Sequence, residues 1–438
     1  MLIEFSVANY RSIKDKATLS LVASTDRRHP DNIFPADGPG KLGLVKTAAI
    51  YGANASGKSN VVEALWLMRQ LVGHSAMEAR GGERLPVTAF RLDPTTVQQP
   101  SEFEVVFAVD GERYVYGFAI DQLRVHEEWL TAARKRTRVL FRRTTEGVEF
   151  GDSWRGDREK LVELTDPGTL LLSRAEQFGN PTVGAAAGWL RDALRSVSDQ
   201  PETTSEMTLT RELLAGGGSA ALQIAELVRA ADTGVAELQV DRVYAYELVE
   251  SRSLAPEAIS QILRSQRPDH DTANPRRVEV VRTRHAGADG ATVTFEVSEE
   301  SSGTQRLLAL SGPIQQVLSE GSTLVIDELD TKLHPLLTRA LVRAFHHADT
   351  GAQLIFTTHD CGLLDSSLFR RDQIWFTEKD RNGATDLYSL WDYDANQVRG
   401  DENFRDGYLR GRYGAIPFVG EFSFEREEEQ AEAGTQGR

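Results

Sequence analysis

The sequence contains a single cysteine, Cys361, so no disulfide bond can form within the chain. No run of apolar residues reaches the length of about 18 that a membrane-spanning helix needs. Positive charge is also scarce, because 65 acidic residues outnumber 50 basic ones and give a formal net charge of −15. That balance disfavours a protein that grips nucleic acid over its whole surface. The first residues, MLIEFSVANYRS, lack the pattern of a secretory signal, so we expect a cytoplasmic protein.

The length of 438 residues predicts more than one domain. Strand and helix patterns alternate over 1–150, strand patterns thin out over 151–275, and they return over 276–420. We therefore expect an α/β fold: a core with a mostly parallel, mixed sheet built from 1–150 and 276–420, and a mostly helical insertion over 151–275. The last residues, 421–438, are acidic and are expected to form a flexible tail. The pair Asp110-Gly111 between two strand patterns predicts a hairpin.

The segment GANASGKS, residues 52–59, lies between an apolar strand pattern and a helical pattern. It fits G-x-x-x-x-G-K-[ST], the pattern of a phosphate-binding loop, at every fixed position. In such a loop the glycines let backbone amides surround phosphates, and the N-terminus of the next helix adds its positive dipole. Lys58 would contact the β- and γ-phosphates, and the Ser59 hydroxyl would bind Mg²⁺. The loop therefore predicts ATP and Mg²⁺ binding through Gly52, Ser56, Gly57, Lys58, Ser59 and Asn60.

Two later strand patterns end in residues suited to catalysis. TLVIDELD, residues 323–330, is a mostly apolar strand pattern followed by acids, the form of a Walker B strand. Asp327 would hold Mg²⁺, and Glu328 is placed to polarise an attacking water as a general base. The next strand pattern, AQLIFTTH, ends in His359. We expect His359 to donate a hydrogen bond to the γ-phosphate.

The string SSGTQ, residues 301–305, precedes an apolar helical run. A helix N-terminus with a hydroxyl and free amides is an anion site. Serine and glycine also favour this position as simple helix caps. The residues alone leave both interpretations open.

Taken in order, these four motifs resemble the ABC-type ATPases. The opening FSVANYRSIKD and Asn54 in the phosphate loop are similar to the SMC, RecF and OLD group of that superfamily. DELDTKLHP, residues 327–335, and GYLRGRYGAIPF, residues 407–418, resemble the RloA-like AAA ATPases of bacterial phage-defence islands. The resemblance implies that Arg11 and Asn54 contact the nucleotide.

The same resemblance implies a dimer in which two ATP molecules lie between two heads packed head to tail. Ser302, Gly303 and Gln305 would then contact the γ-phosphate held by the partner's phosphate loop, and hydrolysis would need a homodimer or a larger oligomer. A separate effector protein, such as a nuclease, is also implied, in an anti-phage or DNA-maintenance system. Thr304 departs from the usual motif, because it replaces the second signature glycine. His334 stands where transporters have aspartate.

Two other functions stay open. Glu378 and the string Asp392-Tyr393-Asp394 are the acids that an OLD-like ATPase-nuclease would need, although only about 70 residues follow 370, too few for a Toprim fold of about 100. A non-catalytic scaffold that uses ATP to store a toxin or effector would carry the same phosphate loop as an enzyme.

Three further groups of residues have less specific readings. The basic cluster RKRTRVLFRR, residues 134–143, fits contact with nucleic acid or a phosphorylated partner, and equally a hairpin edge protected by charge. His346 and His347 beside Asp349 are expected at a solvated helix end rather than in a metal site. Gln98-Gln99 is expected to be a solvated loop, which leaves the Q-loop glutamine unassigned.

Overall fold

The computed structural model describes residues 1–36, 42–78, 84–197, 205–244, 277–288, 290–393 and 403–417. The strands are β1 (Leu2–Ala8), β2 (Ala17–Ser20), β3 (Ile33–Pro35), β4 (Gly43–Val45), β5 (Thr47–Gly52), β6 (Ser101–Val109), β7 (Glu112–Ile120), β8 (Val125–Ala133), β9 (Thr137–Arg143), β10 (Val148–Phe150), β11 (Leu194–Val197), β12 (Glu237–Tyr244), β13 (Arg277–Ala286), β14 (Thr292–Glu296), β15 (Thr323–Ile326), β16 (Gln353–Thr357), β17 (Ile374–Lys379) and β18 (Thr385–Ser389). The α-helices are α1 (Lys58–Glu78), α2 (Arg158–Glu163), α3 (Leu171–Gln177), α4 (Gly184–Gly188), α5 (Ser205–Gly216), α6 (Gly218–Ala230), α9 (Ser302–Glu320), α10 (Pro335–His347) and α11 (Phe404–Leu409).

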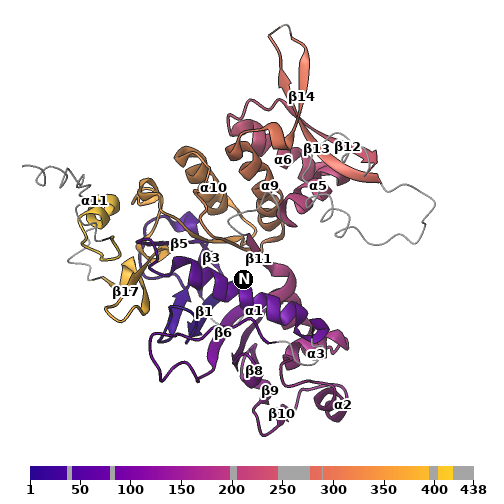
Figure 1. Ribbon diagram of the computed structural model, residues 1–438, viewed down its shortest axis with the longest axis vertical. Coiled ribbons are helices and arrows are strands. Elements are labelled where there is room, and N and C mark those ends of the chain that lie inside the picture. The colour runs from indigo at the N-terminus through magenta and orange to yellow at the C-terminus, as the bar shows by residue number, and fades with distance from the viewer. Residues whose placement is uncertain are drawn as a thin grey trace, which may run out of the picture.

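A six-stranded sheet with the order β11-β15-β16-β5-β17-β18 forms the centre of the molecule (Figure 1). All its neighbouring strands are parallel except β17 and β18. The carboxyl ends of β5, β15 and β16 therefore meet at one edge, where ligands bind in open α/β sheets. This mixed sheet confirms the predicted α/β fold.

A second sheet is wholly antiparallel, with the order β10-β9-β8-β7-β6-β1-β2. Its central hairpin turns at Asp110 and Gly111, whose φ angles of 53° and 74° are the left-handed values of a tight hairpin turn. The predicted hairpin is confirmed.

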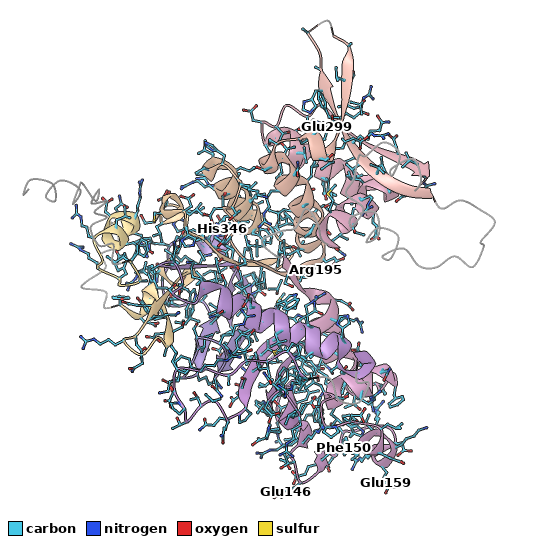
Figure 2. The ribbon with its side chains drawn as sticks, in the orientation of Figure 1. Glu146, Phe150, Glu159, Arg195, Glu299 and His346 are labelled. Atoms are coloured by element: carbon cyan, nitrogen blue, oxygen red, sulfur yellow. The ribbon has the colours of Figure 1, made fainter. Side chains whose placement is uncertain are left out.

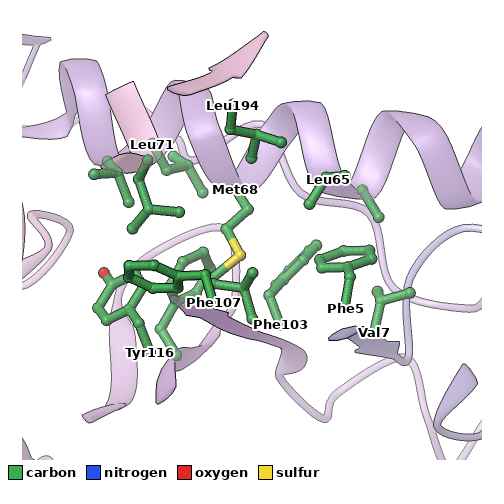
Figure 3. Packing of buried hydrophobic residues seen from close by; sticks show 14 of the residues in the cluster. Phe5, Val7, Leu65, Met68, Leu71, Phe103, Phe107, Tyr116 and Leu194 are labelled. Carbon is green, nitrogen blue, oxygen red and sulfur yellow. The ribbon is translucent and has the colours of Figure 1, made fainter. Parts of the chain in front are cut away.

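Helix α1 lies between the two sheets and joins them in one hydrophobic core. Figure 3 shows Leu65, Met68 and Leu71 of α1 beside Phe5 and Phe107 of the antiparallel sheet. The face of the central sheet that is turned toward α1 contributes to the same core. Because side chains alternate along a strand, the first core takes Ala48 and Ile50 of β5, and the second takes Ala49 and Tyr51.

The second core fills the other face of the central sheet, beneath α9 and α10. Helix α9 contains Pro313, which has no N–H to bond the carbonyl of Ala309. The buried hydroxyl of Thr210 on α5 fills that role, lying 2.9 Å from the carbonyl oxygen of Leu308 and 3.3 Å from that of Ala309. This contact fixes α5 against the middle of α9.

The range 151–275, expected to be a helical insertion, contains α2 to α6 and two strands. Helices α2 to α4 contribute Leu161, Leu171 and Ala186 to the core around α1. β11 pairs with β15 in parallel and is an edge strand of the central sheet. Residues 198–204 and 245–275 of the range, and the tail 421–438, lie outside the described residues. In the part of the chain that the structure describes, none of the helices combines the length and apolar character needed to cross a membrane.

β12, β13 and β14 form a third sheet of three antiparallel strands. The hairpin of β13 and β14 projects from the body of the molecule, at the top of Figure 1. The chain returns from this hairpin through one short 3-10 turn, Val297–Glu299, into α9. The base of the hairpin is therefore next to the string SSGTQ.

Candidate functional site

The phosphate loop connects β5 to α1 at the carboxyl edge of the central sheet. Ala55 and Gly57 have φ angles of 61° and 108°. A Cβ atom on Gly57 would overlap the side chain of Thr385, so this position accepts only glycine. The buried amine of Lys58 donates to the carbonyl oxygens of Gly52 at 2.9 Å and Ala53 at 3.2 Å. The amine therefore lies inside the loop, as a phosphate contact requires.

A chain of hydroxyl groups supports the loop from outside. Thr385 on β18 donates to the carbonyl oxygen of Ser56 at 2.8 Å, and its hydroxyl lies 2.7 Å from that of Ser12. Asn60 donates to Ser12 at 2.5 Å. The Ser56 hydroxyl lies 2.6 Å from that of Thr377 on β17. Ser56 and Asn60, both predicted to contact the nucleotide, thus also hold the loop's shape.

The two acids of the Walker B motif are held by one threonine of the neighbouring strand. Thr357 at the end of β16 donates a 2.5 Å hydrogen bond to the Asp327 carboxylate. The same hydroxyl accepts a 2.7 Å hydrogen bond from the backbone N–H of Glu328. Glu328 has a left-handed φ of 51°, and its carboxylate accepts from Thr331 at 2.9 Å. A non-glycine residue in this conformation must be held by its surroundings, as at many functional sites.

His359 follows β16 at the same edge and lies near these acids. Its backbone N–H points at the Asp330 carboxylate, 3.3 Å from the nearer oxygen. Burial lowers the pKa of His359, the nearby Lys58 lowers it further, and Asp330, Glu328 and Asp327 oppose the shift. Burial likewise lowers the pKa of Lys58, against the attraction of Asp327, Glu328 and Asp330. The predicted phosphate lysine and histidine therefore both lie within electrostatic range of the predicted metal ligand and general base.

The string SSGTQ forms the start of α9. Ser301 is the N-cap, and its hydroxyl accepts from the backbone N–H of Thr304 at 3.1 Å. Ser302 is the first helical residue and is exposed. The amide of Thr304, at the departing position of the motif, is therefore used inside the helix cap. Ser302 and Gly303 are left to present a hydroxyl and amides outward.

Two backbone contacts place this helix start against the turn after the Walker B strand. A Cβ on Gly303 would lie 2.8 Å from the carbonyl oxygen of Lys332, which explains why glycine stands there. The fully buried Arg306 reaches toward the carbonyl oxygens of Asp327 and Glu328, at 3.5 and 3.4 Å. The first turn of α9 is thus packed against the acidic turn of its own chain.

Arg11 directly precedes Ser12, whose hydroxyl belongs to the contacts around the phosphate loop. Its guanidinium forms an ion pair with Glu63 on α1. A pocket of about 390 Å³ opens next to it, and its lining residues are Arg11, Ser12, Thr88, Ala89, Phe90, Arg91, Leu92, Lys379 and Gly383. Because Ser12 also belongs to the hydroxyl chain around the loop, this basic pocket adjoins the phosphate loop. Asn54, in the loop itself, is exposed.

The structure thus brings Lys58, Asp327, Glu328 and His359 together and places Ser302, Gly303 and Gln305 on a separate element. Gln305 donates to the carbonyl oxygen of Glu300 at 2.8 Å. The roles of all these residues stay predictions. For Mg²⁺ the donor set is suitable: Ser59, the second residue of α1, offers a hydroxyl, and the Asp327 carboxylate, which accepts from Thr357, follows β15.

The expectation for His346 was wrong. His346 is not at a solvated helix end but is 4% exposed, and Figure 2 shows it within the body of the molecule. Its Nε2 lies 2.9 Å from the Thr47 hydroxyl and 3.2 Å from the Gln373 amide. Burial lowers the pKa of His346 to about 3, so the ring is neutral. Only His347, the next residue, is exposed.

The acids considered for a nuclease site have structural contacts. Glu378 accepts from the Tyr388 hydroxyl at 3.2 Å and from the backbone N–H of Ala415 at 3.3 Å. Asp392 accepts from the backbone N–H of Ser389 at 2.9 Å, and Asp394 lies outside the described residues. Among the described residues, no group of three or more His, Cys, Asp or Glu side chains is arranged to hold a metal ion.

The basic cluster lies on the β8–β9 hairpin. Arg138 pairs with Glu112 at 2.7 Å, and the mostly buried Arg143 donates to the carbonyl oxygen of Thr169 at 2.6 Å. Arg134, Lys135 and Arg136 are exposed at the tip. β9 has a neighbour on both sides, so the cluster is not on an edge strand.

The site contains a phosphate loop, a Walker B strand and a serine-glycine helix start, and β16, the strand before His359, lies between the first two. This combination defines the chain as a P-loop ATPase head of the ABC type. The chain belongs to the family described as "AAA domain, putative AbiEii toxin, Type IV TA system", whose model matches residues 48–168 and 229–365, more than half of the chain.

Solved structures of SMC heads are similar to the chain over most of its length. One is an SMC head bound to the C-winged helix domain of ScpA, with 13% identity, 89% of this chain and 97% of that chain covered, and a TM-score of 0.48. The SMC head of Thermotoga maritima has 12% identity, coverages of 89% and 98%, and a TM-score of 0.40. An SMC head from Pyrococcus furiosus, bound to the C-terminal domain of ScpA, has 12% identity, coverages of 89% and 96%, and a TM-score of 0.37. No curated protein sequence matches the chain.

Proposed function

We propose that the chain is an ATP-hydrolysing switch that works as a homodimer. One observation carries the proposal: at the carboxyl edge of the central sheet, the Asp327 and Glu328 carboxylates lie close enough to Lys58 and His359 to act on the pKa of both. Phosphoryl transfer needs positioning and charge stabilisation more than covalent chemistry. A phosphate-binding lysine, a metal-binding carboxylate, a base and a hydrogen-bond donor at one edge meet that need.

Each residue has a definite task in this proposal. Ser59 and Asp327 would hold Mg²⁺, which would supply positive charge to the phosphates. Glu328 accepts the proton of the attacking water, and its strained backbone keeps the carboxylate at the turn. The lowered pKa of His359 keeps its ring neutral near pH 7, so the ring donates one hydrogen bond without adding charge.

The pocket beside the loop takes the nucleoside end of ATP. It continues from Ser12, which belongs to the loop's hydroxyl chain, and Arg11, Arg91 and Lys379 give it positive charge. The Arg11–Glu63 ion pair is exposed, so it can open at little cost when Arg11 contacts the nucleotide.

The second half of each site comes from the partner protomer. Ser302 is exposed at the start of a helix of 19 residues, which has a substantial positive end. The Thr304 amide is already used in the helix cap, so the hydroxyl of Ser302 and the amides around Gly303 form the γ-phosphate contact. Binding of ATP then closes two heads, and hydrolysis reopens them.

The output of the switch goes to an effector, in a defence system against phage or foreign DNA. The family description names a toxin of a toxin–antitoxin system, which supports a role linked to a toxic effector. On this proposal the ATP-bound dimer and the open protomer differ in their affinity for that effector.

The experiment measures ATP turnover per protomer against protein concentration, together with the size of the Glu328→Gln variant in ATP. We expect turnover to rise with concentration, because the site needs two heads. Glu328→Gln should bind ATP, lose turnover at least about a hundredfold, and accumulate as a dimer. Turnover that is constant per protomer would refute the dimeric site.

The same variant separates a switch from a scaffold. If Glu328→Gln still protects cells against phage while hydrolysis is lost, the chain is an ATP-dependent scaffold that holds its effector. If protection is lost with hydrolysis, the switch is supported. Glu320→Gln, an exposed acid at the far end of α9, is the matched control and should behave as wild type.

A further inference from the structure

The segment in front of α9 is held by two residues of the projecting sheet. The carboxylate of Glu300, directly before the N-cap Ser301, accepts a hydrogen bond from the Thr283 hydroxyl. It also lies 2.7 Å from Nε2 of His285. The side chains of Glu300 and His285 are 9% and 25% exposed, and Thr283 is fully buried. Both donors are on β13, the central strand of the three-stranded sheet.

Glu300 also contacts the string SSGTQ through its main chain. Its carbonyl oxygen accepts from the Gln305 amide at 2.8 Å, and the backbone N–H of Gln305 bonds the carbonyl oxygen of Ser301 at 2.9 Å. One residue therefore connects β13 to both ends of the string. In Figure 2 its neighbour Glu299 lies at the base of the projecting hairpin.

We propose that His285 and Thr283 are positioning residues for the phosphate contact of Ser302 and Gly303, so that the projecting sheet controls ATP turnover. This inference rests on the proposed function. A nearly buried carboxylate keeps its place only while its donors are present. If His285 is lost, Glu300 moves toward water, and the exposed helix start beside it moves with it.

The hairpin is suited to transmit such a movement. The ring of His285 packs edge-on against Phe295 of β14, with centroids 5.1 Å apart. A displacement of β14 therefore moves the His285 ring, and the contact of that ring with Glu300 transmits the movement to Ser302. The strand tip projects from the body, so a partner can reach it (Figure 1).

The test compares His285→Ala with His285→Gln, which keeps an N–H donor. Arg284→Ala is the matched control, because Arg284 is the next residue on β13, faces the opposite side, and pairs with Glu237 at 2.8 Å. Three quantities are measured: ATP affinity at a protein concentration below that of dimerisation, kcat at saturating protein, and the protein concentration at which the dimer forms in ATP.

We expect His285→Ala to keep its ATP affinity, to lose kcat about tenfold or more, and to need about tenfold more protein to dimerise. His285→Gln should recover kcat to within about threefold of wild type. Arg284→Ala should match wild type in all three measurements. Thr283→Val, which removes the other donor, is expected to act in the same direction and serves if His285→Ala does not fold.

Wild-type kcat in both His285→Ala and Thr283→Val would overturn the inference. An equal loss in Arg284→Ala would also overturn it, because a general weakening of the sheet would then be the cause. A different result would refute the proposed function, namely a wild-type turnover per protomer that does not depend on protein concentration. The two failures are therefore distinguishable in the same set of assays.

Discussion

The hydroxyl of Thr357 lies between the two acids of the site, 2.5 Å from the carboxylate of Asp327 and 2.7 Å from the backbone nitrogen of Glu328. Thr357 is fully buried at the end of β16, so its hydroxyl has little freedom to move. One side chain of the neighbouring strand thus orients the predicted metal ligand and fixes the backbone of the predicted base.

Removal of this hydroxyl should impair catalysis more than nucleotide binding. We expect Thr357→Val, which has nearly the same shape, to lower kcat about 10- to 100-fold while ATP affinity changes little. The control Thr357→Ser keeps the hydroxyl and should retain most of the activity. A Val variant with wild-type kcat at saturating Mg²⁺ would contradict the assigned role.

Gly303 should tolerate no side chain. We expect Gly303→Ala to lower turnover at least about tenfold, because its Cβ would lie 2.8 Å from the Lys332 carbonyl oxygen and α9 would have to shift. ATP binding by the phosphate loop, which lies on other elements, should remain. Gly73→Ala is the control: it is a helical glycine with nothing within 4 Å of its Cβ position, and it should be neutral or stabilising by up to about 1 kcal/mol. Equal loss in both variants would argue against a specific contact.

The buried His346 should make stability depend on pH. Its pKa is lowered to about 3 in the folded protein, so the unfolded chain takes up a proton first as the pH falls below about 6.5. Stability is therefore complete above that pH and is lost between about 6.5 and 3. We expect about 2 kcal/mol to be lost between pH 7 and pH 5.

Urea unfolding at the two pH values measures this loss. The difference between wild type and His346→Gln, which cannot titrate, isolates the contribution of the one ring. His347→Gln, on the exposed neighbour, should keep the wild-type dependence on pH. A His346→Gln protein with the wild-type dependence would show that this ring is not the source.

Two tyrosines should respond differently to loss of their hydroxyls. Tyr51 is 1% exposed, and within the described residues its hydroxyl has no hydrogen-bond partner. Tyr51→Phe should therefore raise the free energy of unfolding by about 1 kcal/mol or leave it unchanged. Tyr388 donates to the Tyr413 carbonyl oxygen at 2.7 Å, so Tyr388→Phe should lower it by about 1 kcal/mol or more. Urea unfolding checks both, and a destabilised Tyr51→Phe would mean that its hydroxyl has a partner.

The sequence predicts the parts of the site that lie within single short segments. The phosphate loop, the acids after β15 and His359 after β16 can be found because each motif combines a strand with a few polar residues in fixed order. The parallel sheet then brings these strand ends to one edge. No such local signal exists for Ser12 and Thr385, which support the loop from segments far away in the chain. Thr357 had a weak signal, as a hydroxyl at the end of the strand beside the Walker B motif.

Other details depend on packing that sequence patterns do not contain. The four residues of β11 are too few to show a strand period within a mostly helical range, yet they complete one edge of the central sheet. His346 was expected at a solvated helix end, but Thr47 and Gln373 contact its ring from other segments. At the start of α9, two serines in a row leave the cap ambiguous, and the geometry assigns it to Ser301.

The central claim is that each ATP site combines the phosphate loop of one protomer with Ser302 of its partner. The most direct test mixes two inactive variants, Lys58→Ala and Ser302→Arg, and measures ATP turnover of the mixture. In the mixed dimer, one site has both an intact Lys58 and an intact Ser302. We predict that an equal mixture recovers about one quarter of wild-type turnover, because half of the dimers are mixed and each has one complete site. If no ratio of the two variants restores turnover, Ser302 does not act across the dimer, and the account is contradicted.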